Sequence, residues 1–297
     1  MVRIVSLLPS TTEILFALGA GDAVVGVTFE CDFPPVARQR RIVSTSSLPE
    51  GLSPAAVDEL VRQRMAAGED LYHLDEGALA TLNADVVVTQ DLCAVCAVDV
   101  SVVDDALAHL GCAADVVTID PHTLAEVLAS IRRLGAVSGT EAAAETLLHD
   151  LRSRLDVVAS AVADEPRPRV MVLEWTDPPF APGHWIPEMV DAAGAVSTLG
   201  TAGQKSHRTT WEDIAASRPD VVVSAPCGFD LASSVELAHA VVDAGVLPAD
   251  VPVWAADANA SFARPGPRLV DGVEALSAIA HPAVMGEPDA ASARRVR

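Results

Sequence analysis

The opening segment RIVSLLPSTTEILFALG, residues 3–19, decides the fold class. Its first six residues, RIVSLL, are mostly apolar and predict a buried strand. Ser10 then predicts the N-cap of a helix, because Glu13 follows three residues later and completes a capping box, and Gly19 predicts the end of that helix. A strand that leads directly into a helix is the repeating unit of a parallel sheet covered by helices.

The same alternation continues through the first half of the chain. Short valine-rich segments predict further buried strands, and the segments between them predict helices. The expected strands are 24–28, 41–44, 85–90 and 115–119, and the expected helices are 53–67, 75–82 and 99–110. Strands that alternate with helices favour the α/β class with a parallel sheet.

The pattern changes to helix alone between residues 123 and 163. Two apolar stripes at helical spacing occur there, and the second predicts one long helix at about 140–163. Prolines follow this helix, and a new strand is expected at 169–175. We therefore expect an N-terminal α/β lobe at 1–138, a linking backbone helix at 139–165 and a C-terminal α/β lobe at 166–297.

An internal repeat relates the two expected lobes. The segment ASRPDVVVSAPC (216–227) echoes TLNADVVVTQDLC (81–93), since each has a helix before it, an Asp-Val-Val-Val strand and a cysteine beyond the strand. The distance along the chain from the start of the first strand to the aspartate of the repeated segment is 82 residues in the first lobe, Arg3 to Asp85, and 51 in the second, Arg169 to Asp220. The first lobe is therefore expected to carry an insertion, at 53–76. Two Rossmann-like lobes joined by one long rigid helix predict a ligand cleft between the lobes, beyond the carboxyl ends of the strands.

The charge pattern excludes several classes of partner. The net charge is −21 and Lys205 is the only lysine, so the sequence offers no basic stripe for phosphates. We expect no nucleic acid partner. No segment approaches the roughly 18 uninterrupted apolar residues of a membrane span, so no membrane insertion is expected.

The first residues lack a signal peptide's apolar core, which predicts a cytoplasmic location and free thiols or thiol ligands rather than disulfides.

The cysteines follow expected strand ends, with one exception. Cys112 precedes a strand instead, and we expect it to pack at the opposite rim. Thiolates that gather at one edge of a sheet suit Zn or an iron-sulfur cluster, so the four others are predicted metal ligands. These are Cys31, Cys93, Cys96 and Cys227. Two other interpretations stay open, a redox couple formed by the CxxC pair and simple burial of small residues.

Other chemically capable side chains end strands or lie in rigid loops. Glu174 and Trp175 end a strand, and the following loop PPFAPGHW carries His184 and Trp185. Arg264 lies in a Pro/Gly-rich loop, where it meets either an anionic ligand or a surface carboxylate. The motifs GxGxxG, GxxxxGK[ST], GxSxG and HExxH are absent from the sequence, so we assign no catalytic residue and favour a role that is not enzymatic.

Three segments resemble a known family: RIVSLLPSTTEILFALGAGDAVVGVTFECDFPP (3–35), PRVMVLEWTDPPF (168–180) and SFARPGPRLVDGVEAL (261–276). Together they are similar to the cobalamin-binding proteins of ABC importers, within the helical-backbone substrate-binding proteins for iron-siderophores, haem and corrinoids. The resemblance spans nearly the whole chain. It implies two α/β lobes bridged by one long helix, a large ligand in the cleft and an ABC permease as a partner.

The chain also departs from the pattern of that family. Members that hold cobalamin line the cleft with aromatic residues, and the matching places here are polar: Glu30, Ser46, Gln90 and Ser261. Members of the family contact their permease through two carboxylates, and the matching positions here are Gly77 and Ala263. The permease-binding carboxylates are therefore missing, or one of them is displaced to Glu76. The sequence thus predicts the family's fold with a modified site, on a branch without a secretion signal.

These observations lead to one main hypothesis and two alternatives. The main hypothesis is a binding protein for cobalamin or a related metal chelate, such as another corrinoid, haem or a siderophore. The four thiols and His184 would serve as metal or cobalt ligands, and the ligand-binding residues would be Glu30, Ser46, Gln90, Glu174, Trp175, His184, Trp185, Ser261 and Arg264. The second hypothesis is a cytosolic metalloprotein or redox enzyme with Zn or an iron-sulfur cluster at the same thiols. The third gives the thiols a structural role beside an unrelated polar ligand.

Overall fold

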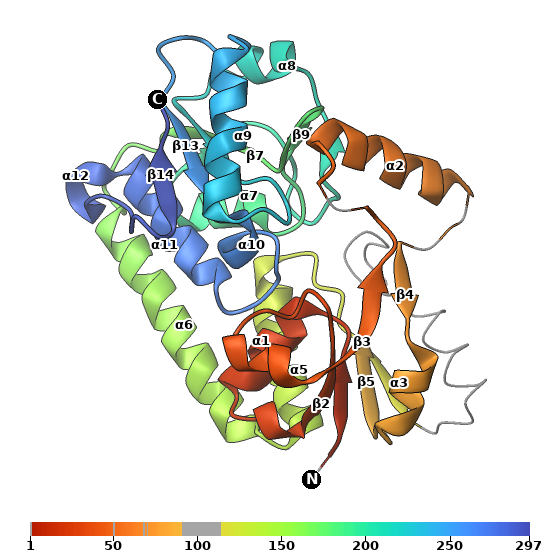
Figure 1. The fold of residues 1–297 in the computed structure, drawn as a ribbon. Helices are drawn as coiled ribbons and strands as arrows, with labels where there is room; N and C mark the ends of the chain where they lie inside the picture. Colours follow the sequence, from red (N-terminus) through yellow and green to blue (C-terminus); the bar gives the residue numbers. More distant parts are fainter. Residues whose placement is uncertain (1, 50, 68, 70, 91–113) are drawn as a thin grey trace. The chain divides into compact units, whose positions relative to one another are not determined.

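The chain divides into two units, each built on its own mainly parallel sheet (Figure 1). The computed structural model describes residues 2–49, 51–67, 69, 71–90 and 114–297. Unit 1 comprises Met1–Pro121 with Leu128–Leu148, and unit 2 comprises His122–Val127 with His149–Arg297. The predicted α/β class is confirmed. The helix expected at 99–110 lies outside the described residues.

The sheet of unit 1 has the strand order β4-β3-β2-β1-β5-β6, and only β4 runs antiparallel to its neighbour. Its strands are β1 (Ile4–Ser6), β2 (Val24–Thr28), β3 (Arg41–Ser46), β4 (Tyr72–Leu74), β5 (Val86–Thr89) and β6 (Asp115–Thr118). Its first helices are α1 (Pro9–Ala17), α2 (Pro54–Ala67) and α3 (Glu76–Thr81), with 3-10 turns at Gly21–Ala23 and Pro35–Gln39. Figure 1 shows α1 and α3 on opposite sides of this sheet, so that its central strands are covered on both faces.

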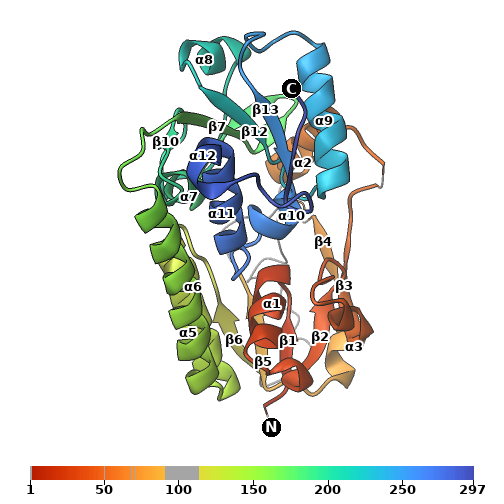
Figure 2. The same ribbon diagram turned by 90° about the vertical axis from the view of Figure 1, so that its left-hand side faces the viewer.

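The main sheet of unit 2 has the order β10-β7-β12-β13-β14, in which β14 alone is antiparallel. Its strands are β7 (Arg169–Leu173), β10 (Val196–Ser197), β12 (Val221–Ser224), β13 (Val253–Ala256) and β14 (Ala293–Arg295). A small antiparallel sheet joins β8 (Trp175–Thr176), β9 (Pro179–Ala181) and β11 (His207–Arg208). The helices are α7 (Ile186–Ala192), α8 (Trp211–Ala216), α9 (Leu231–Asp243), α10 (Ala258–Ser261), α11 (Leu269–Ala280) and α12 (Pro282–Met285). Figure 2 shows α9 on one side of the main sheet and α7 and α11 on the other.

Two consecutive helices, α5 (Leu124–Ser138) and α6 (Glu141–Ala161), fill the stretch that the sequence marks as helix alone. Both are divided between the units, α5 at residue 128 and α6 at residue 149. Within unit 2, the Arg154 guanidinium of α6 donates hydrogen bonds to Asp271 at 2.5 Å and to Glu274 at 2.6 and 2.8 Å, both on α11. The predicted long helix is confirmed, and the linking role of 139–165 stays a prediction.

The predicted repeat between the two halves is confirmed at the start of the sheets. In unit 1 the Asp85 carboxylate accepts the backbone N–H of Arg3 at 2.7 Å, and the Arg3 guanidinium donates to the Leu82 carbonyl at 2.7 Å. Unit 2 repeats this arrangement, with the Asp220 carboxylate on the Arg169 N–H at 2.7 Å and the Arg169 guanidinium on the Ser217 carbonyl at 2.7 Å. We call each arrangement a strand-start clamp, defined by its arginine and aspartate.

The two sheets also share strand order, which locates the insertion. The order β2-β1-β5-β6 of unit 1 matches β10-β7-β12-β13 of unit 2. Unit 1 adds β3, α2 and β4 at one edge, and these elements include the predicted insertion at 53–76. No residue of α2 is fully buried. The insertion is therefore an addition at the edge of the repeated core and not a part of it.

One local prediction, the capping box at the start of the first helix, is wrong. The N-cap of α1 is Leu8, Pro9 occupies the first turn, and no side chain caps the helix. Ser10 is therefore inside the helix, where Pro9 fits because the first helical residue needs no backbone N–H. The Thr11 hydroxyl instead donates to the Leu8 carbonyl at 3.1 Å. The predicted helix end is correct, since Gly19 takes a positive φ of 74° after the last turn.

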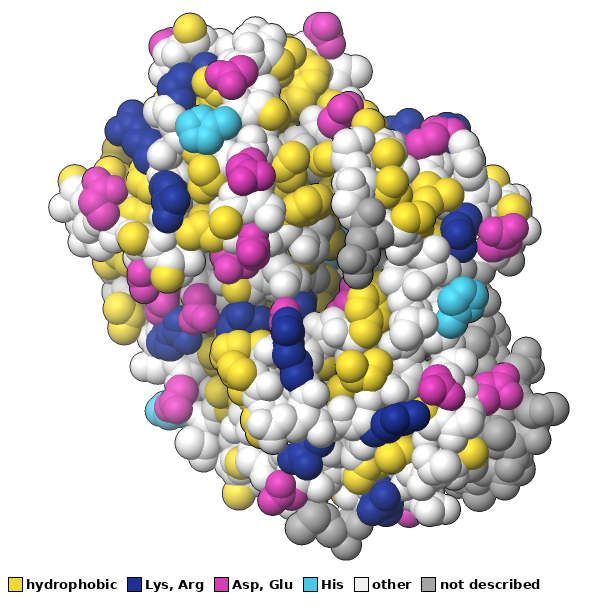
Figure 3. Space-filling model, in the orientation of Figure 1, with side chains coloured by type: hydrophobic (Ala, Val, Ile, Leu, Met, Phe, Trp, Pro, Cys, Tyr) yellow, Lys and Arg dark blue, Asp and Glu magenta, His cyan; other side chains and the backbone are white. Residues whose placement is uncertain are grey.

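The surface carries the acidic bias of the sequence. Figure 3 shows acidic side chains scattered over one face among arginines. Ion pairs such as Arg132 with Glu145 at 2.6 Å and Arg167 with Asp191 at 2.5 Å lie at the surface. Exposed pairs of this kind are screened by water and contribute little, so the core and the sheets determine the fold.

Replacing the aspartate of either strand-start clamp should destabilise the chain. In Asp85→Ala and Asp220→Ala the backbone N–H of the paired arginine loses a carboxylate acceptor, at a cost of about 1 kcal/mol for an exposed bond of this type. Denaturant unfolding followed by circular dichroism measures this change. Asp164→Ala, at an exposed position after α6, is the control and should change the free energy of unfolding by less than about 0.5 kcal/mol. Equal values for all three variants would contradict a stabilising role for the clamps.

Candidate ligand-binding residues

The candidate residues follow the carboxyl ends of parallel strands in both units. In unit 1, Glu30 and Cys31 follow β2, Ser46 ends β3 and Gln90 follows β5. In unit 2, Glu174 and Trp175 follow β7, Cys227 follows β12, and Ser261 and Arg264 follow β13. Because the carboxyl ends of parallel strands lie at one edge of a sheet, each unit presents its candidates at a single edge. Cys93 and Cys96 lie outside the described residues.

In unit 1, Glu30 belongs to a small polar and aromatic group. Its carboxylate accepts a hydrogen bond from the Tyr72 hydroxyl at 3.3 Å. The Phe29 ring lies 6.0 Å from the Tyr72 ring, centroid to centroid, and Phe29 is 37% exposed. Tyr72 begins β4, the strand added by the insertion, and pairs directly with Ser46 of β3. The insertion thus supplies an aromatic residue, Tyr72, which lies beside Phe29 and contacts Glu30.

The Cys31 thiol lies inside unit 1. The residue is 1% exposed, and its sulfur is 3.0 Å from the Thr12 hydroxyl oxygen of α1. Thr12 in turn donates to the Ser6 hydroxyl at 2.8 Å, and Ser6 is 2.6 Å from the Thr11 hydroxyl. Cys31 therefore takes part in a buried hydroxyl network that joins β1 to α1.

Two further candidates of unit 1 are polar and mostly buried. Gln90 is 5% exposed. The Ser46 hydroxyl accepts the backbone N–H of Leu48 at 3.0 Å, which fixes the turn after β3. Both side chains offer the hydrogen-bonding groups expected from the sequence.

In unit 2, Glu174 has an unusual environment. Desolvation by burial raises the pKa of its carboxyl group from 4.5 to about 7, and hydrogen bonds from the Ser206 hydroxyl and the Gly183 backbone oppose this shift. Its own carbonyl accepts the backbone N–H of Cys227 at 3.0 Å, which links the loops after β7 and β12. The carboxyl group is thus engaged within unit 2.

His184 stands on a tightly constrained turn. Its φ is 49°, in the left-handed region, and its backbone N–H donates to the Gln204 carbonyl at 2.6 Å. The imidazole lies 6.0 Å from the His122 ring and 5.5 Å from the Trp185 ring. Burial, together with the charges of His122 and Lys205, lowers the pKa of His184. Among the described residues no partner reaches its buried Nε2 atom, so the ring offers a neutral nitrogen that can bind a metal or accept a hydrogen bond.

The two candidate tryptophans differ. Trp185 is 6% exposed and its indole N–H donates to the Phe262 carbonyl at 2.8 Å, so it packs inside unit 2. Trp175 is half-buried, lies 5.6 Å from the Phe229 ring and donates to the Asp177 carbonyl at 3.1 Å. Trp175 and Phe229 together form an aromatic pair at the edge of the sheet.

Ser261 and Arg264 are both largely buried, at 5% and 8% exposure. Ser261 ends α10, whose N-terminus is capped by the Asp257 carboxylate accepting the Ala260 N–H at 2.9 Å. Burial raises the pKa of Asp257, against the opposing effect of the Ala260 hydrogen bond and the charge of Arg268. A buried arginine here is consistent with the predicted meeting of Arg264 and an anionic group.

The predicted thiol cluster gains no support from the described part of the chain. There, no group of three or more His, Cys, Asp or Glu side chains is arranged to hold a metal ion. Cys31 is buried and Cys227 is exposed.

Sequence reasoning missed several polar residues of unit 2. Ser206, which donates to Glu174, lies in a loop with no motif of its own, and the only signal was the glycine-rich sequence around it.

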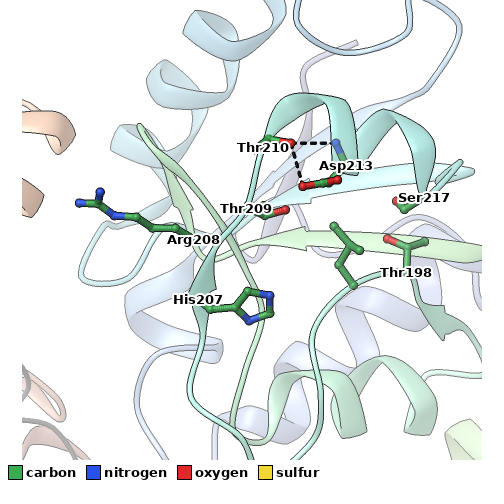
Figure 4. Close-up of a pocket in the computed structure, with 8 residues that line it drawn as sticks. Thr198, His207, Arg208, Thr209, Thr210, Asp213 and Ser217 are labelled. Atoms are coloured by element: carbon green, nitrogen blue, oxygen red, sulfur yellow. Dashed lines mark hydrogen bonds between the residues drawn. The ribbon is translucent and has the colours of Figure 1, made fainter.

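A pocket of about 620 Å³ in the same unit is lined by Thr198, Leu199, His207, Arg208, Thr209, Thr210, Asp213 and Ser217. Figure 4 shows the His207 ring turned into this pocket and the Arg208 side chain turned away from it. Thr210 and Asp213 are engaged with each other at the start of α8, and none of the predicted site residues lines the pocket.

Similarity to known proteins shows the family of this chain. Residues 80–240 match the model of the periplasmic binding protein family, and the chain belongs to that family. The chain is 25% identical over 287 residues to the ABC transporter substrate-binding lipoprotein YvrC of Bacillus subtilis, covering 94% of this chain and 80% of the relative. It is 24% identical to the vitamin B12-binding protein of Vibrio cholerae, covering 92% of this chain and 86% of the relative.

Solved structures agree with this fold. The periplasmic vitamin B12 binding protein of Vibrio cholerae aligns with a TM-score of 0.63 at 22% identity, over 93% of this chain and 94% of that one. A periplasmic heme binding protein from Pseudomonas aeruginosa aligns with a TM-score of 0.69 at 22% identity, over 95% and 93%. At these identities the structures show the fold alone.

The expected cytoplasmic location is wrong. The family is that of periplasmic binding proteins, one relative is a lipoprotein and the aligned structures are periplasmic, which points to a location outside the cytoplasm. In the part of the chain that the structure describes, no helix is both long enough and apolar enough to cross a membrane.

The environment of Glu174 predicts a pH-dependent stability. Between pH 4.5 and about 7 the folded chain keeps a proton that the unfolded chain has released, so the free energy of unfolding falls as the pH rises through this range, by on the order of 2–3 kcal/mol for this group. Glu174→Gln stays neutral and should remove this slope in denaturant unfolding at pH 5, 6, 7 and 8. Asp177→Asn, at a nearby exposed carboxylate, should keep the wild-type slope. Identical slopes in wild type and Glu174→Gln would show that the carboxyl titrates normally.

The two described thiols should differ in reactivity. Iodoacetamide should modify Cys227 in the folded protein, since this residue is exposed, and should modify Cys31 only after denaturation, since that residue is 1% exposed. Peptide mapping by mass spectrometry resolves each site. Modification of Cys31 at the rate of Cys227 under native conditions would contradict its place in the buried hydroxyl network.

Proposed function

We propose that the chain is the substrate-binding component of an ABC importer and that its ligand is cobalamin or a closely related metal chelate. The observation that carries this proposal is the similarity over more than nine-tenths of the chain to a vitamin B12-binding protein, together with membership of the periplasmic binding protein family. The aligned structures of vitamin B12 and heme binding proteins have the same fold.

The polar edges of the sheets favour a corrinoid over haem. Glu30, Ser46 and Gln90 stand where cobalamin-binding members carry aromatic residues, so they offer less stacking surface, but their hydrogen-bonding groups suit the amide side chains at the rim of a corrin ring. The net charge of −21 opposes the approach of haem, whose propionates are negatively charged, whereas cyanocobalamin has no net charge. Electrostatics and hydrogen-bonding capacity therefore point to the same ligand.

The proposed roles of the unit 2 residues follow from their environment. The Trp175 and Phe229 pair provides an apolar surface for the face of a large ring. His184 provides a neutral imidazole whose Nε2 suits the central metal of a chelate. Arg264 and Ser261 provide polar groups after β13, for a negatively charged or amide group of the ligand.

The alternative of a Zn or iron-sulfur protein is the weaker candidate. It requires Cys31, Cys93, Cys96 and Cys227 to act together, and the Cys31 thiol is engaged with Thr12 inside unit 1.

A permease partner is part of the main proposal. The family's docking carboxylates are absent at Gly77 and Ala263, and the exposed Glu76 at the start of α3 is the proposed substitute in unit 1.

Titration with two chelates tests this function. We expect cyanocobalamin to bind with a Kd of about 1 μM or tighter and to quench tryptophan fluorescence. Hemin should bind at least about tenfold more weakly at low salt, and its affinity should rise with added salt as the acidic surface is screened, because the Debye length falls from about 30 Å at 0.01 M to about 10 Å at 0.1 M. Cyanocobalamin binding should not depend on salt.

Matched tryptophan variants identify the stacking surface. Trp175→Leu should weaken cyanocobalamin binding by about tenfold, the equivalent of about 1.4 kcal/mol for a lost aromatic contact. Trp211→Phe, at the start of α8 and outside the proposed site residues, should leave the affinity unchanged. Failure of both chelates to bind wild type at micromolar concentration would overturn the proposed ligand class, and stoichiometric Zn or iron with sulfide in protein purified without oxygen would favour the alternative.

A further inference from the structure

The pocket of about 620 Å³ beside α8 is built from three segments of unit 2 (Figure 4), and we call it the α8 pocket. The turn after β10 forms one wall, where the Thr198 N–H donates to the backbone of β7 at 3.0 Å. The second wall is β11 with Thr209, whose N–H donates to the first residue of β9 at 2.9 Å. The third is α8 with Ser217, whose carbonyl accepts from Arg169 of the strand-start clamp at 2.7 Å. Hydrogen bonds within unit 2 therefore hold all three walls, and the volume lies in the range of about 300–1,000 Å³ typical of small-molecule sites.

Three hydroxyl groups that line the α8 pocket already donate their only proton within the protein. The Ser217 hydroxyl donates to a carbonyl of α8 at 2.7 Å, and the Thr198 hydroxyl donates to the Met171 sulfur at 3.5 Å. The Thr210 hydroxyl donates to the Asp213 carboxylate at 2.8 Å. Because a hydroxyl has one proton and two lone pairs, Ser217 and Thr198 can accept hydrogen bonds from a molecule in the pocket but cannot donate to it.

The negative charge of the α8 pocket comes from Asp213. One oxygen of its carboxylate accepts from Thr210, and the other is a further acceptor. Arg208, the lining residue with a fixed positive charge, has its side chain turned away from the pocket, whereas the His207 ring is turned into it (Figure 4). The lining therefore favours a molecule that donates hydrogen bonds, and the net charge of −21 adds to the attraction of this surface for cations.

Other classes of ligand fit the α8 pocket poorly. An apolar molecule would meet one aliphatic side chain in the lining, that of Leu199. A phosphate or carboxylate group would approach Asp213 while the Arg208 side chain points elsewhere. A metal ion needs several ligands, and the described part of the chain has no group of three or more His, Cys, Asp or Glu side chains arranged to hold one. A positively charged molecule that is rich in hydrogen-bond donors satisfies the lining better than any of these.

We propose that the α8 pocket binds a small organic cation with several hydroxyl groups, such as an amino sugar or an amino alditol. Its ammonium group pairs with Asp213, and its hydroxyls donate to Ser217 and Thr198. The His207 ring covers part of its carbon skeleton. This site goes beyond the proposed function, because none of the residues assigned to the metal chelate lines the α8 pocket.

Three six-carbon polyols that differ only at one end test the preference for a cation. Glucamine ends in an ammonium group, sorbitol in a hydroxyl and gluconate in a carboxylate, and near pH 7 the ammonium and the carboxylate are both ionised. Isothermal titration calorimetry of the full chain at low salt should give a Kd on the order of 1 mM for glucamine. Sorbitol should bind about threefold to fivefold more weakly, since an exposed ion pair is worth up to about this factor, and gluconate should bind more weakly than sorbitol.

Two neighbouring carboxylates of α8 provide a matched pair of variants. Asp213→Asn removes the charge inside the pocket and should reduce the affinity for glucamine to that for sorbitol, while its amide oxygen still accepts from Thr210. Glu212→Gln makes the same change of charge at an exposed position of α8 outside the lining and should keep the preference for glucamine. Ser217→Ala removes an acceptor and should weaken glucamine and sorbitol binding alike, by about threefold. Far-UV circular dichroism checks that each variant is folded.

The ranking of the three probes on wild type decides the proposal even if a variant fails to fold. The proposal is overturned if glucamine does not bind at about 10 mM, if sorbitol binds equally well, or if gluconate binds as tightly as glucamine. A loss in Glu212→Gln equal to that in Asp213→Asn would assign the preference to general surface charge and would also overturn it. No chelate is present in these titrations, so the outcome for cyanocobalamin and hemin is decided separately.

Discussion

A carboxylate that accepts the first backbone N–H of a neighbouring strand fixes the start of the sheet in each unit. Asp85 does this for Arg3 and Asp220 does it for Arg169, and each arginine reaches back to the turn before its aspartate. Because the side chains of a strand alternate between faces, a slip of one residue would move the buried valines of β5 or β12 to the opposite face of the sheet and disrupt the packing on both sides. The clamps therefore hold the register on which the core depends.

The same register decides where the functional loops emerge. With the strand starts aligned, strands of similar length end together, and the residues that follow them gather at one edge. Glu30 and Gln90 share this edge in unit 1, and Glu174 and Cys227 share it in unit 2, where the Cys227 N–H bonds to the Glu174 carbonyl. The position of the candidate site is thus a consequence of the repeated topology, whatever side chains occupy it.

Sequence reasoning predicted the architecture well, because architecture depends on patterns that local chemistry creates. Valine-rich segments marked the strands, the DVVV echo marked the repeat, and Gly19 marked a helix end that needs a positive φ. The capping box failed because Pro9 is an equally good first residue of a helix and starts α1 before Ser10. The prediction of a cytoplasmic location was wrong because it was inferred only from the absence of a recognisable signal peptide. Membership of the periplasmic binding protein family is stronger evidence of location than that absence.

The chemistry of individual site residues was harder to predict, because it depends on contacts between distant segments. Trp185 and Trp175 look alike in sequence, yet one is held inside by the Phe262 carbonyl and the other pairs with Phe229 at the edge. The Cys31 thiol turns toward Thr12, which no spacing of cysteines could reveal. Tyr72 reaches Glu30 only because the insertion adds β4 beside β3.

Glu174 shows how a binding site and a stable fold make opposing demands. Burial disfavours the ionised carboxyl, so above its raised pKa the chain as a whole is less stable than it would be with a neutral group there. The ionised form nevertheless makes the stronger bonds to Gly183 and Ser206. A neutral side chain would improve global stability above that pKa and would make weaker bonds to Gly183 and Ser206. Glu174 therefore makes the stability of unit 2 depend on pH, whereas a glutamine at the same place would not.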